Sequence, residues 1–224
     1  MFVQEVLIKK SRMAKGVLEG KKAREYERLY GHLRDKEFDN FILKNVGKGK
    51  RVCDLCCGTG YILDLLKNKV KEVVGIDMAT EMVKICNEKF KKNKKVKAKV
   101  GSATNTKLKP NSFDYVTIKM GLHHIKDKEG VMKEAHRILK KGGKIIIIDK
   151  SYVNLFEMYW KALRKFITKG VIISINEYLL SKEKNEEIIE EKYKDKFKIV
   201  KKKNLPPDKE HSGQVFMYVL EKNG

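Results

Sequence analysis

The chain has 224 residues, a length that suits one α/β domain with a complete hydrophobic core. Apolar residues make up 42% and charged residues 36%, which is typical of a globular protein with a heavily charged surface. The apolar stretch at residues 1–8 is interrupted by Gln4 and Glu5 and is too short for a signal peptide, and no apolar run could span a bilayer. We therefore expect a cytoplasmic protein without a transmembrane segment.

The formal net charge of +22 comes from 51 lysines and arginines against 29 acidic residues. The most biased stretch, residues 81–110, holds ten lysines and two glutamates. Such a positive field would attract RNA or an anionic membrane surface. The alternative is a solvated surface in a lysine-rich proteome, and scarce glutamine beside abundant lysine and glutamate is typical of thermophiles. We favour the solvated surface, because the lysines are spread along the whole chain.

The four cysteines lie at positions 53, 56, 57 and 86. Three of them cluster on one predicted strand, which argues against a secreted disulfide framework. Cys53 and Cys56 have the C-x-x-C spacing of some metal and redox sites, but residues three apart on a strand face opposite sides of it. We therefore predict neither a metal centre nor redox chemistry.

The predicted elements begin with two helices, at residues 25–33 and 38–46, where apolar residues recur at helical spacing. Strands and helices then alternate, which predicts a parallel sheet with helices on both faces. The run from Ile145 to Ile148 is apolar at every position, as a strand buried on both faces should be. The expected strands are 51–56, 72–77, 96–101, 113–118 and 144–149, and the helices between them are 61–68, 80–91 and 128–140, the last ending at Gly142-Gly143.

The pattern changes after residue 150. Residues 152–180 hold 18 apolar residues out of 29 and the only tryptophan. A charged helix is predicted at 177–192, and two closing strands at 197–203 and 215–221. Since a polar loop with Pro206-Pro207 joins these strands without a helix, we expect them to be antiparallel.

The most informative stretch is residues 51–60, Arg-Val-Cys-Asp-Leu-Cys-Cys-Gly-Thr-Gly. An apolar strand, a glycine turn and a helix in succession form a nucleoside-cofactor site, because glycine lets the backbone approach the ligand closely. Leu63 stands where a dinucleotide fingerprint would need its third glycine. The order of residues instead resembles motif I of the class I S-adenosylmethionine-dependent methyltransferases.

This resemblance implies roles for the residues of the turn. Asp54 would contact the amino-acid end of S-adenosylmethionine, directly or through water, and Gly58 and Gly60 would allow close backbone approach. Cys56 replaces the family's first turn glycine and would lie near the cofactor. A cysteine fits there if its backbone angle is ordinary, and we do not interpret it as a nucleophile.

Two further strand ends resemble the cofactor motifs of the family. Asp77 ends the stretch 72–77, where a carboxylate can accept hydrogen bonds from both ribose hydroxyls, and Met78 would lie against the adenine. The alternative for Asp77 is an acid at the start of the next helix. The family usually carries an aspartate where Ser102 stands, before Ala103; the serine can accept the adenine bond only weakly, and an ordinary turn is the alternative.

Two later stretches, 112–125 and 134–143, resemble the branch that includes ubiquinone- and menaquinone-biosynthesis methyltransferases. In that branch the backbones of Lys119 and Met120 would line the methyl-transfer site. His123 and His124 are acid/base candidates, because histidine titrates near neutral pH. The alternative is that one caps the following helix and the other packs beneath it, since aligned methyl transfer often needs no strong base.

The apolar segment 152–180 has three interpretations. In the family, a segment inserted here often covers the acceptor, so it could be a lid that selects an apolar substrate. It could instead pack against the core or form a dimer face. A third interpretation is an amphipathic helix on a membrane, favoured by Trp160, Lys161, Arg164 and Lys165.

The predicted fold is a Rossmann-like class I methyltransferase domain with a seven-stranded, mostly parallel sheet. It comprises a helical lead (1–50), a cofactor core (51–150), a helical insert (151–196) and a closing hairpin (197–224). The predicted function is methyl transfer from S-adenosylmethionine to a small, aromatic or prenylated acceptor. An RNA methyltransferase and a non-catalytic, cofactor-binding partner subunit are the alternatives, and no oligomeric state is predicted.

Overall fold

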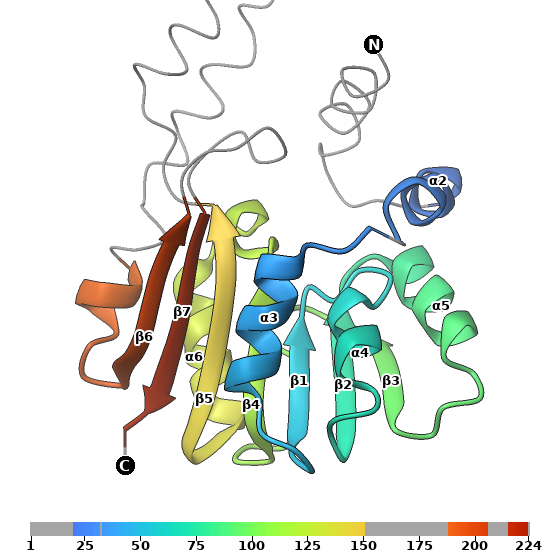
Figure 1. Cartoon of the computed structure of the whole chain (residues 1–224). Helices are drawn as coiled ribbons and strands as arrows, with labels where there is room; N and C mark the ends of the chain where they lie inside the picture. The colour runs from blue at the N-terminus through green and yellow to red at the C-terminus, as the bar shows by residue number, and fades with distance from the viewer. Residues whose placement is uncertain (1–19, 32, 151–187, 206–214, 224) are drawn as a thin grey trace, which may run out of the picture.

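The computed structural model describes residues 20–31, 33–150, 188–205 and 215–223. Its centre is a seven-stranded sheet with the order β3-β2-β1-β4-β5-β7-β6, and the five parallel strands point to the same edge (Figure 1). The parallel strands are β1 (Arg51–Leu55), β2 (Glu72–Asp77), β3 (Val96–Val100), β4 (Phe113–Lys119) and β5 (Leu139–Lys150). The closing strands are β6 (Phe197–Leu205) and β7 (Val215–Lys222), which pair antiparallel as predicted.

Helices cover both faces of the sheet. In Figure 1, α3 lies in front of the sheet and α6 behind it. The described helices are α2 (Lys21–Tyr30), α3 (Lys36–Asn45), α4 (Tyr61–Leu66), α5 (Thr80–Lys89) and α6 (Lys128–Ile138), with a 3₁₀ turn η1 (Leu122–His124) and a short π-helix η2 (Ile188–Lys192). The predicted helix 177–192 is described only from residue 188, and the segment 152–180 lies outside the described residues.

The apolar run of β5 joins two hydrophobic cores. Ile145 and Ile147 pack in the core beneath α6, whereas Ile146 and Ile148 pack in the core beneath α3, α4 and α5. All four side chains are buried, which confirms the prediction of a strand covered on both faces. This central strand fixes the relative position of the two helical layers.

The prediction that helix 128–140 ends at Gly142-Gly143 was wrong. The helix α6 ends at Ile138, and Leu139 already pairs with Phe113 as the start of β5. Gly142 and Gly143 lie in a bulge of that strand, where the pairing with β4 shifts register. Gly142 has φ +68°, and a Cβ at Gly143 would lie 2.9 Å from a backbone oxygen, so the bulge itself requires glycine.

The described residues contain no cluster of three or more side chains suited to a metal ion. Cys53 is buried inside β1, whereas Cys56 lies in the turn after the strand, so the C-x-x-C spacing brings no ligand pair together on one strand face. In the part of the chain that the structure describes, no helix is long and apolar enough to cross a membrane.

Candidate active site

The carboxyl ends of β1, β2, β4 and β5 meet at one edge of the sheet (Figure 1). In open α/β sheets, ligands bind outside this edge at the point where the strand order reverses. Here the order reverses between β1 and β4, and the turn 56–60 leaves the sheet at that point. Most of the polar residues predicted for the cofactor follow these strands.

The two turn glycines have left-handed backbones, with φ +52° at Gly58 and φ +91° at Gly60. A Cβ at Gly60 would lie 2.7 Å from the sulfur of Cys86 and 2.8 Å from the ring of Phe90, so glycine is needed for the turn to pack on α5. A Cβ at Gly58 would meet nothing within 4 Å. The turn therefore presents its backbone to open space at Gly58, as a cradle for a ligand requires.

Cys56 does not meet the condition of an ordinary backbone angle under which a cysteine was expected to fit. Its φ is +62°, in the left-handed region that favours glycine. The side chain fits because Gly121, after β4, leaves room: a Cβ on Gly121 would lie 2.5 Å from that of Cys56. Met120 is left-handed too, with φ +53°. Such backbone outliers concentrate at functional sites.

Burial raises the pKa of the Cys56 thiol well above its ordinary value, and the nearby carboxylates of Asp77, Asp54 and Asp149 raise it further. Since the thiolate is the reactive form of cysteine, the thiol at this position is a poor nucleophile. This agrees with its interpretation from the sequence as a small turn residue.

Asp54 is a buried acid whose carboxylate has one hydrogen-bond partner among the described residues. It is 2% exposed, and its Oδ1 accepts a bond of 2.6 Å from the hydroxyl of Thr117. Burial raises the pKa of Asp54 to about 7, although the Thr117 bond and the charge of Lys119 act in the opposite direction. Its charge therefore responds to any cation that approaches the turn.

Asp77 ties the turn to the next helix. Its Oδ2 accepts the N–H of Gly58 at 2.8 Å, and its Oδ1 accepts the N–H of Ala79 at 2.9 Å. Ala79 is the N-cap of α5, so the helix-start interpretation of Asp77 holds in part. Because each carboxylate oxygen can accept more than one hydrogen bond, Asp77 retains capacity for ligand hydroxyls.

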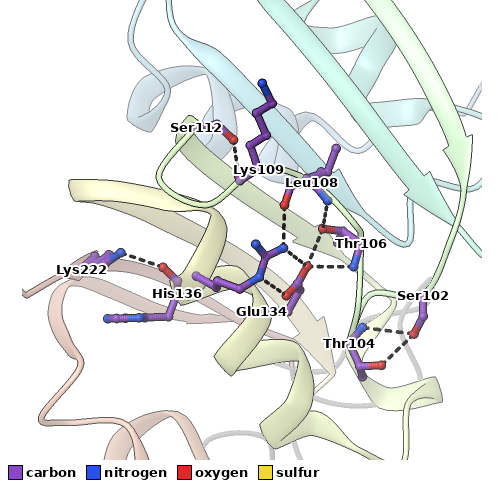
Figure 2. A network of polar contacts seen from close by, with 10 residues as sticks. Ser102, Thr104, Thr106, Leu108, Lys109, Ser112, Glu134, His136 and Lys222 are labelled. Carbon is purple, nitrogen blue, oxygen red and sulfur yellow. Dashed lines mark hydrogen bonds and ion pairs between the residues drawn. The ribbon is translucent and has the colours of Figure 1, made fainter.

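The residues predicted near the adenine differ in exposure. Met78 is 63% exposed at the rim of the site. The Ser102 hydroxyl lies 2.8 Å from that of Thr104 and accepts the Thr104 N–H, so it closes a local turn (Figure 2). Ala103 is buried in the core beneath α6. Of these three, only Met78 presents a side chain that the fold leaves uncommitted.

Lys119 and Met120 end β4 in different ways. The ammonium of Lys119 lies 4.0 Å from the ring centre of Tyr61 and 5.4 Å from that of Phe38, so its charge rests on two aromatic faces. The N–H of Met120 donates to the carbonyl of Ile148 at 2.7 Å. The backbone after β4 is thereby held against β5 at the edge where the turn 56–60 also lies.

The two histidines belong to η1, and one of them has a partner that the sequence reasoning missed. Nδ1 of His123 lies 2.5 Å from Oδ1 of Asp149, a fully buried acid near the end of β5. The signal was present, because Asp149 comes directly after the apolar run of β5, just as Asp77 comes directly after that of β2. The rings of His123 and His124 are 3.9 Å apart.

Comparisons with known proteins agree with this geometry. A family model described as a methyltransferase domain matches residues 53–147. A demethylmenaquinone methyltransferase of Geobacillus sp. is 33% identical over 158 residues, covering 66% of this chain and 67% of that protein. One from Staphylococcus aureus is 31% identical over 170 residues, covering 70% of each.

Solved structures share the fold. The phosphoethanolamine N-methyltransferase 2 of Haemonchus contortus in complex with S-adenosyl-L-methionine has a TM-score of 0.66 at 21% identity, covering 90% of this chain and 56% of that one. The YcgJ protein of Bacillus subtilis has a TM-score of 0.61 at 17% identity, covering 85% of this chain and all of that one.

The sheet order, the glycine turn after β1 and the acid after β2 define an S-adenosylmethionine-dependent methyltransferase of class I. The chain belongs to this family, in the branch of menaquinone- and ubiquinone-biosynthesis methyltransferases. It is therefore an enzyme whose cofactor is S-adenosylmethionine.

Proposed function

We propose that this methyltransferase acts on a small, prenylated aromatic acceptor of the quinone type. The observation that carries the proposal is the 31–33% identity to demethylmenaquinone methyltransferases over about two thirds of the chain. The named acceptor of those relatives is a prenylated ring, which agrees with the aromatic or prenylated acceptor expected from the sequence.

We propose that the cofactor lies over the turn 56–60. The open space at Gly58 supports this position, because a bulkier residue there would fill the cradle. Asp54 would face the amino-acid end of the cofactor, and Asp77 would accept from the ribose hydroxyls. The remaining proposed contacts are Cys56, Gly60, Met78, Ser102, Ala103, Lys119 and Met120.

S-adenosylmethionine supplies a methyl group already activated on a sulfonium. The task of the chain is therefore to hold an acceptor atom in line with that methyl and to exclude water, and such alignment alone can supply roughly 7–11 kcal/mol. The fixed backbone at Cys56 and Met120 supports this role, because both residues are held in a conformation that neighbouring strands impose.

We keep the domain division and the lid interpretation of residues 152–180 as proposals.

The acceptor is tested by incubating the enzyme with methyl-labelled S-adenosylmethionine and reduced demethylmenaquinone, beside RNA and small polar fractions of a cell extract. Label in the quinone fraction supports the proposal. Label in RNA would contradict it and give the net charge of +22 a direct part in substrate binding. Binding of S-adenosylhomocysteine without label in any fraction would favour a partner subunit.

The cofactor site is tested by Asp77→Ala. Losing charge-assisted bonds to two hydroxyls should weaken S-adenosylhomocysteine binding about 10- to 100-fold, measured by calorimetry. Glu88→Ala is the matched control, because Glu88 is an exposed acid near the end of the neighbouring α5. Unchanged affinity in a folded Asp77→Ala protein would show that the ribose contact is assigned wrongly.

A further inference from the structure

Three acids gather at the carboxyl edge of the sheet, and the proposed cofactor site uses only two. Asp54 lies in β1 close to the turn, Asp77 is the last residue of β2, and Asp149 lies next to the last residue of β5. Asp149 is 0% exposed, which is unusual for a carboxyl group unless it has partners. Its partners therefore indicate what it does.

Every described partner of Asp149 is an N–H or a ring nitrogen. Oδ2 accepts the N–H of Leu122 at 2.6 Å and that of His123 at 3.4 Å, and Oδ1 accepts the N–H of Lys150 at 2.7 Å. The ring Nδ1 of His123 lies 2.5 Å from Oδ1. A carboxylate surrounded by donors accepts from the ring as well, so the proton of the neutral imidazole lies on Nδ1.

This tautomer leaves Nε2 of His123 with its lone pair. Among the described residues, none forms a hydrogen bond to Nε2. The side chain is 22% exposed, so the ring is anchored on one side and accessible on the other. A base oriented by a buried carboxylate is the arrangement that proton abstraction requires.

The position of His123 is beside the proposed methyl-transfer site. Gly121, two residues earlier, packs against the side chain of Cys56 in the cofactor turn. The charge of Asp149 also acts on the Cys56 thiol and raises its pKa, after burial and the two other acids. The pair on η1 and β5 thus lies next to the turn on β1.

His124 is less suited to the same task. Burial lowers the pKa of His124 to about 4, and the neighbouring His123 lowers it further. Asp149 raises the pKa of His124, and Lys150 lowers it. A base so weak near neutral pH gives little driving force for removing a hydroxyl proton.

We propose that His123, oriented by Asp149, is the general base that removes a proton from a hydroxyl group on the acceptor. This inference rests on the proposed function and narrows its substrate class to hydroxylated aromatic rings, such as the reduced form of a quinone. Asp149 is a positioning residue, since it acts through the imidazole.

The step balances without a further reagent. The hydroxyl proton passes to Nε2 of His123, and its electron pair stays on oxygen and enriches the adjacent ring carbon. That carbon forms a bond to the methyl group as the methyl–sulfur bond breaks, with the electron pair of that bond remaining on sulfur. The ring C–H proton then leaves to solvent and returns the ring to its aromatic form as a phenolate. The phenolate oxygen takes the first proton back from Nε2 of His123, so the hydroxyl and the neutral imidazole are restored and one proton is released overall.

The main test is His123→Asn, because the asparagine amide can still donate to Asp149 while the Nε2 position is lost. Methyl transfer to reduced demethylmenaquinone should fall about 10²- to 10⁴-fold at pH 7. The loss should shrink as pH rises, since hydroxide then ionises the acceptor directly. His136→Asn on α6 is the matched histidine control, and calorimetry with S-adenosylhomocysteine checks that the cofactor site is intact.

A second readout needs no turnover. In the complex with S-adenosylhomocysteine and reduced demethylmenaquinone, the absorption band of the acceptor's ionised hydroxyl group should appear at lower pH in the wild type than in His123→Asn or Asp149→Asn. The inference is wrong if His123→Asn binds the cofactor normally and methylates the acceptor at the wild-type rate. It is also wrong if the methylation rate of this variant falls by the same factor at every pH. A wild type that binds cofactor but never methylates this acceptor would instead overturn the proposed function.

Discussion

Among single residues, Asp54 carries the clearest pH dependence. Its pKa in the folded chain is about 7 because it is buried, against an ordinary value of 3.8. The stability that its protonated form contributes is present below pH 3.8 and is lost as pH rises through about 7. A bound cation would favour the ionised form, so cofactor binding and this ionisation should be linked.

We therefore expect the affinity for S-adenosylmethionine to rise with pH below about 7, by at most about tenfold per pH unit, and to level off above it. Asp54→Asn should bind more weakly and lose this pH dependence. Calorimetric titrations between pH 5.5 and pH 8.5 measure the affinity of the wild type and of Asp54→Asn for S-adenosylmethionine. A wild-type affinity that does not change over this range would contradict the proposed contact.

The contact between Cys56 and Gly121 gives a prediction of coupling. In Gly121→Ala, the new methyl group would lie 2.5 Å from the Cβ of Cys56, so overpacking should cost about 1–3 kcal/mol of stability. In a Cys56→Gly background the same change should cost much less. Urea unfolding of the four proteins measures the coupling energy, and additive effects would contradict the contact.

For single residues, the sequence predicted which residues lie at the edge of the site better than it predicted their backbone angles. Asp54, Gly58 and Asp77 could be placed together at the carboxyl edge because each lies in the end of an apolar strand or just beyond it, and the topology brings strand ends together. The left-handed angle of Cys56 could not be found, because it depends on the space that Gly121 leaves 65 positions further along the chain. Asp149 was overlooked because its histidine partner comes from a different strand end.

Among the elements, the connection between β3 and β4 is fastened to α6 by a network of hydrogen bonds that is centred on a buried acid. Glu134 accepts both the N–H and the hydroxyl of Thr106, at 2.8 and 2.5 Å, and two bonds of 2.7 Å from Arg137 (Figure 2). Arg137 also donates to the carbonyl of Leu108. The loop that begins at Ser102 is thereby held in place below the proposed adenine end.

Glu134→Gln should lower the free energy of unfolding by about 1–3 kcal/mol at pH 7, because a charged acceptor of four bonds is lost. Glu129→Gln is the matched control on the same helix, since its ion pair with Lys192 is exposed and should contribute little. Urea unfolding measures the free energy of unfolding of both variants. Equal effects of the two changes would contradict the role of the buried network.

The same acid predicts how stability depends on pH. Burial alone would raise the pKa of Glu134, but the bonds from Arg137 and Thr106 outweigh it and lower the pKa to about 2. A depressed pKa contributes stability that is present above pH 4.5 and is lost as pH falls towards 2. This part of the acid sensitivity should be absent in Glu134→Gln.

The order and type of the elements could be predicted because strand and helix periods alternate clearly from residue 51 to residue 150. The end of α6 could not be predicted, because a glycine pair is typical both of the end of a helix and of a bulge in a strand. The pairing of Leu139 with Phe113 decides between them, and it is a contact between distant residues.

At the scale of the whole molecule, within the part that the structure describes, the site acids and a group of lysines lie at opposite edges of the sheet. The three acids of the site lie at the carboxyl ends of the parallel strands, whereas exposed lysines gather where these strands begin. Part of this pattern complements the carboxyl ends of the helices, which carry partial negative charge. At the edge where the strands begin, the exposed lysines without an ion pair to any described residue include Lys48, Lys50, Lys71, Lys91, Lys92, Lys94, Lys95 and Lys141.

Since these lysines repel one another, the melting temperature should rise by a few degrees between about 0.02 and 0.5 M sodium chloride, because salt screens exposed charges. Replacing Lys92, Lys94 and Lys95 by glutamate should reduce the rise more than replacing the control set, Lys36, Lys84 and Lys133, which lie away from this edge. A melting temperature that falls with salt would show that attractive pairs dominate instead.

The acids at the other end of the sheet have a consequence for repeated turnover. S-adenosylmethionine carries a sulfonium charge that its by-product, S-adenosylhomocysteine, lacks. Carboxylates such as Asp54 and Asp77 attract this sulfonium charge, and that part of the attraction is lost in the by-product, which keeps its ammonium group and its ribose hydroxyls. With the cofactor placed as proposed, each completed transfer removes one of the attractions that held it, so the by-product should be bound less tightly than the unused cofactor, by the sulfonium contribution alone.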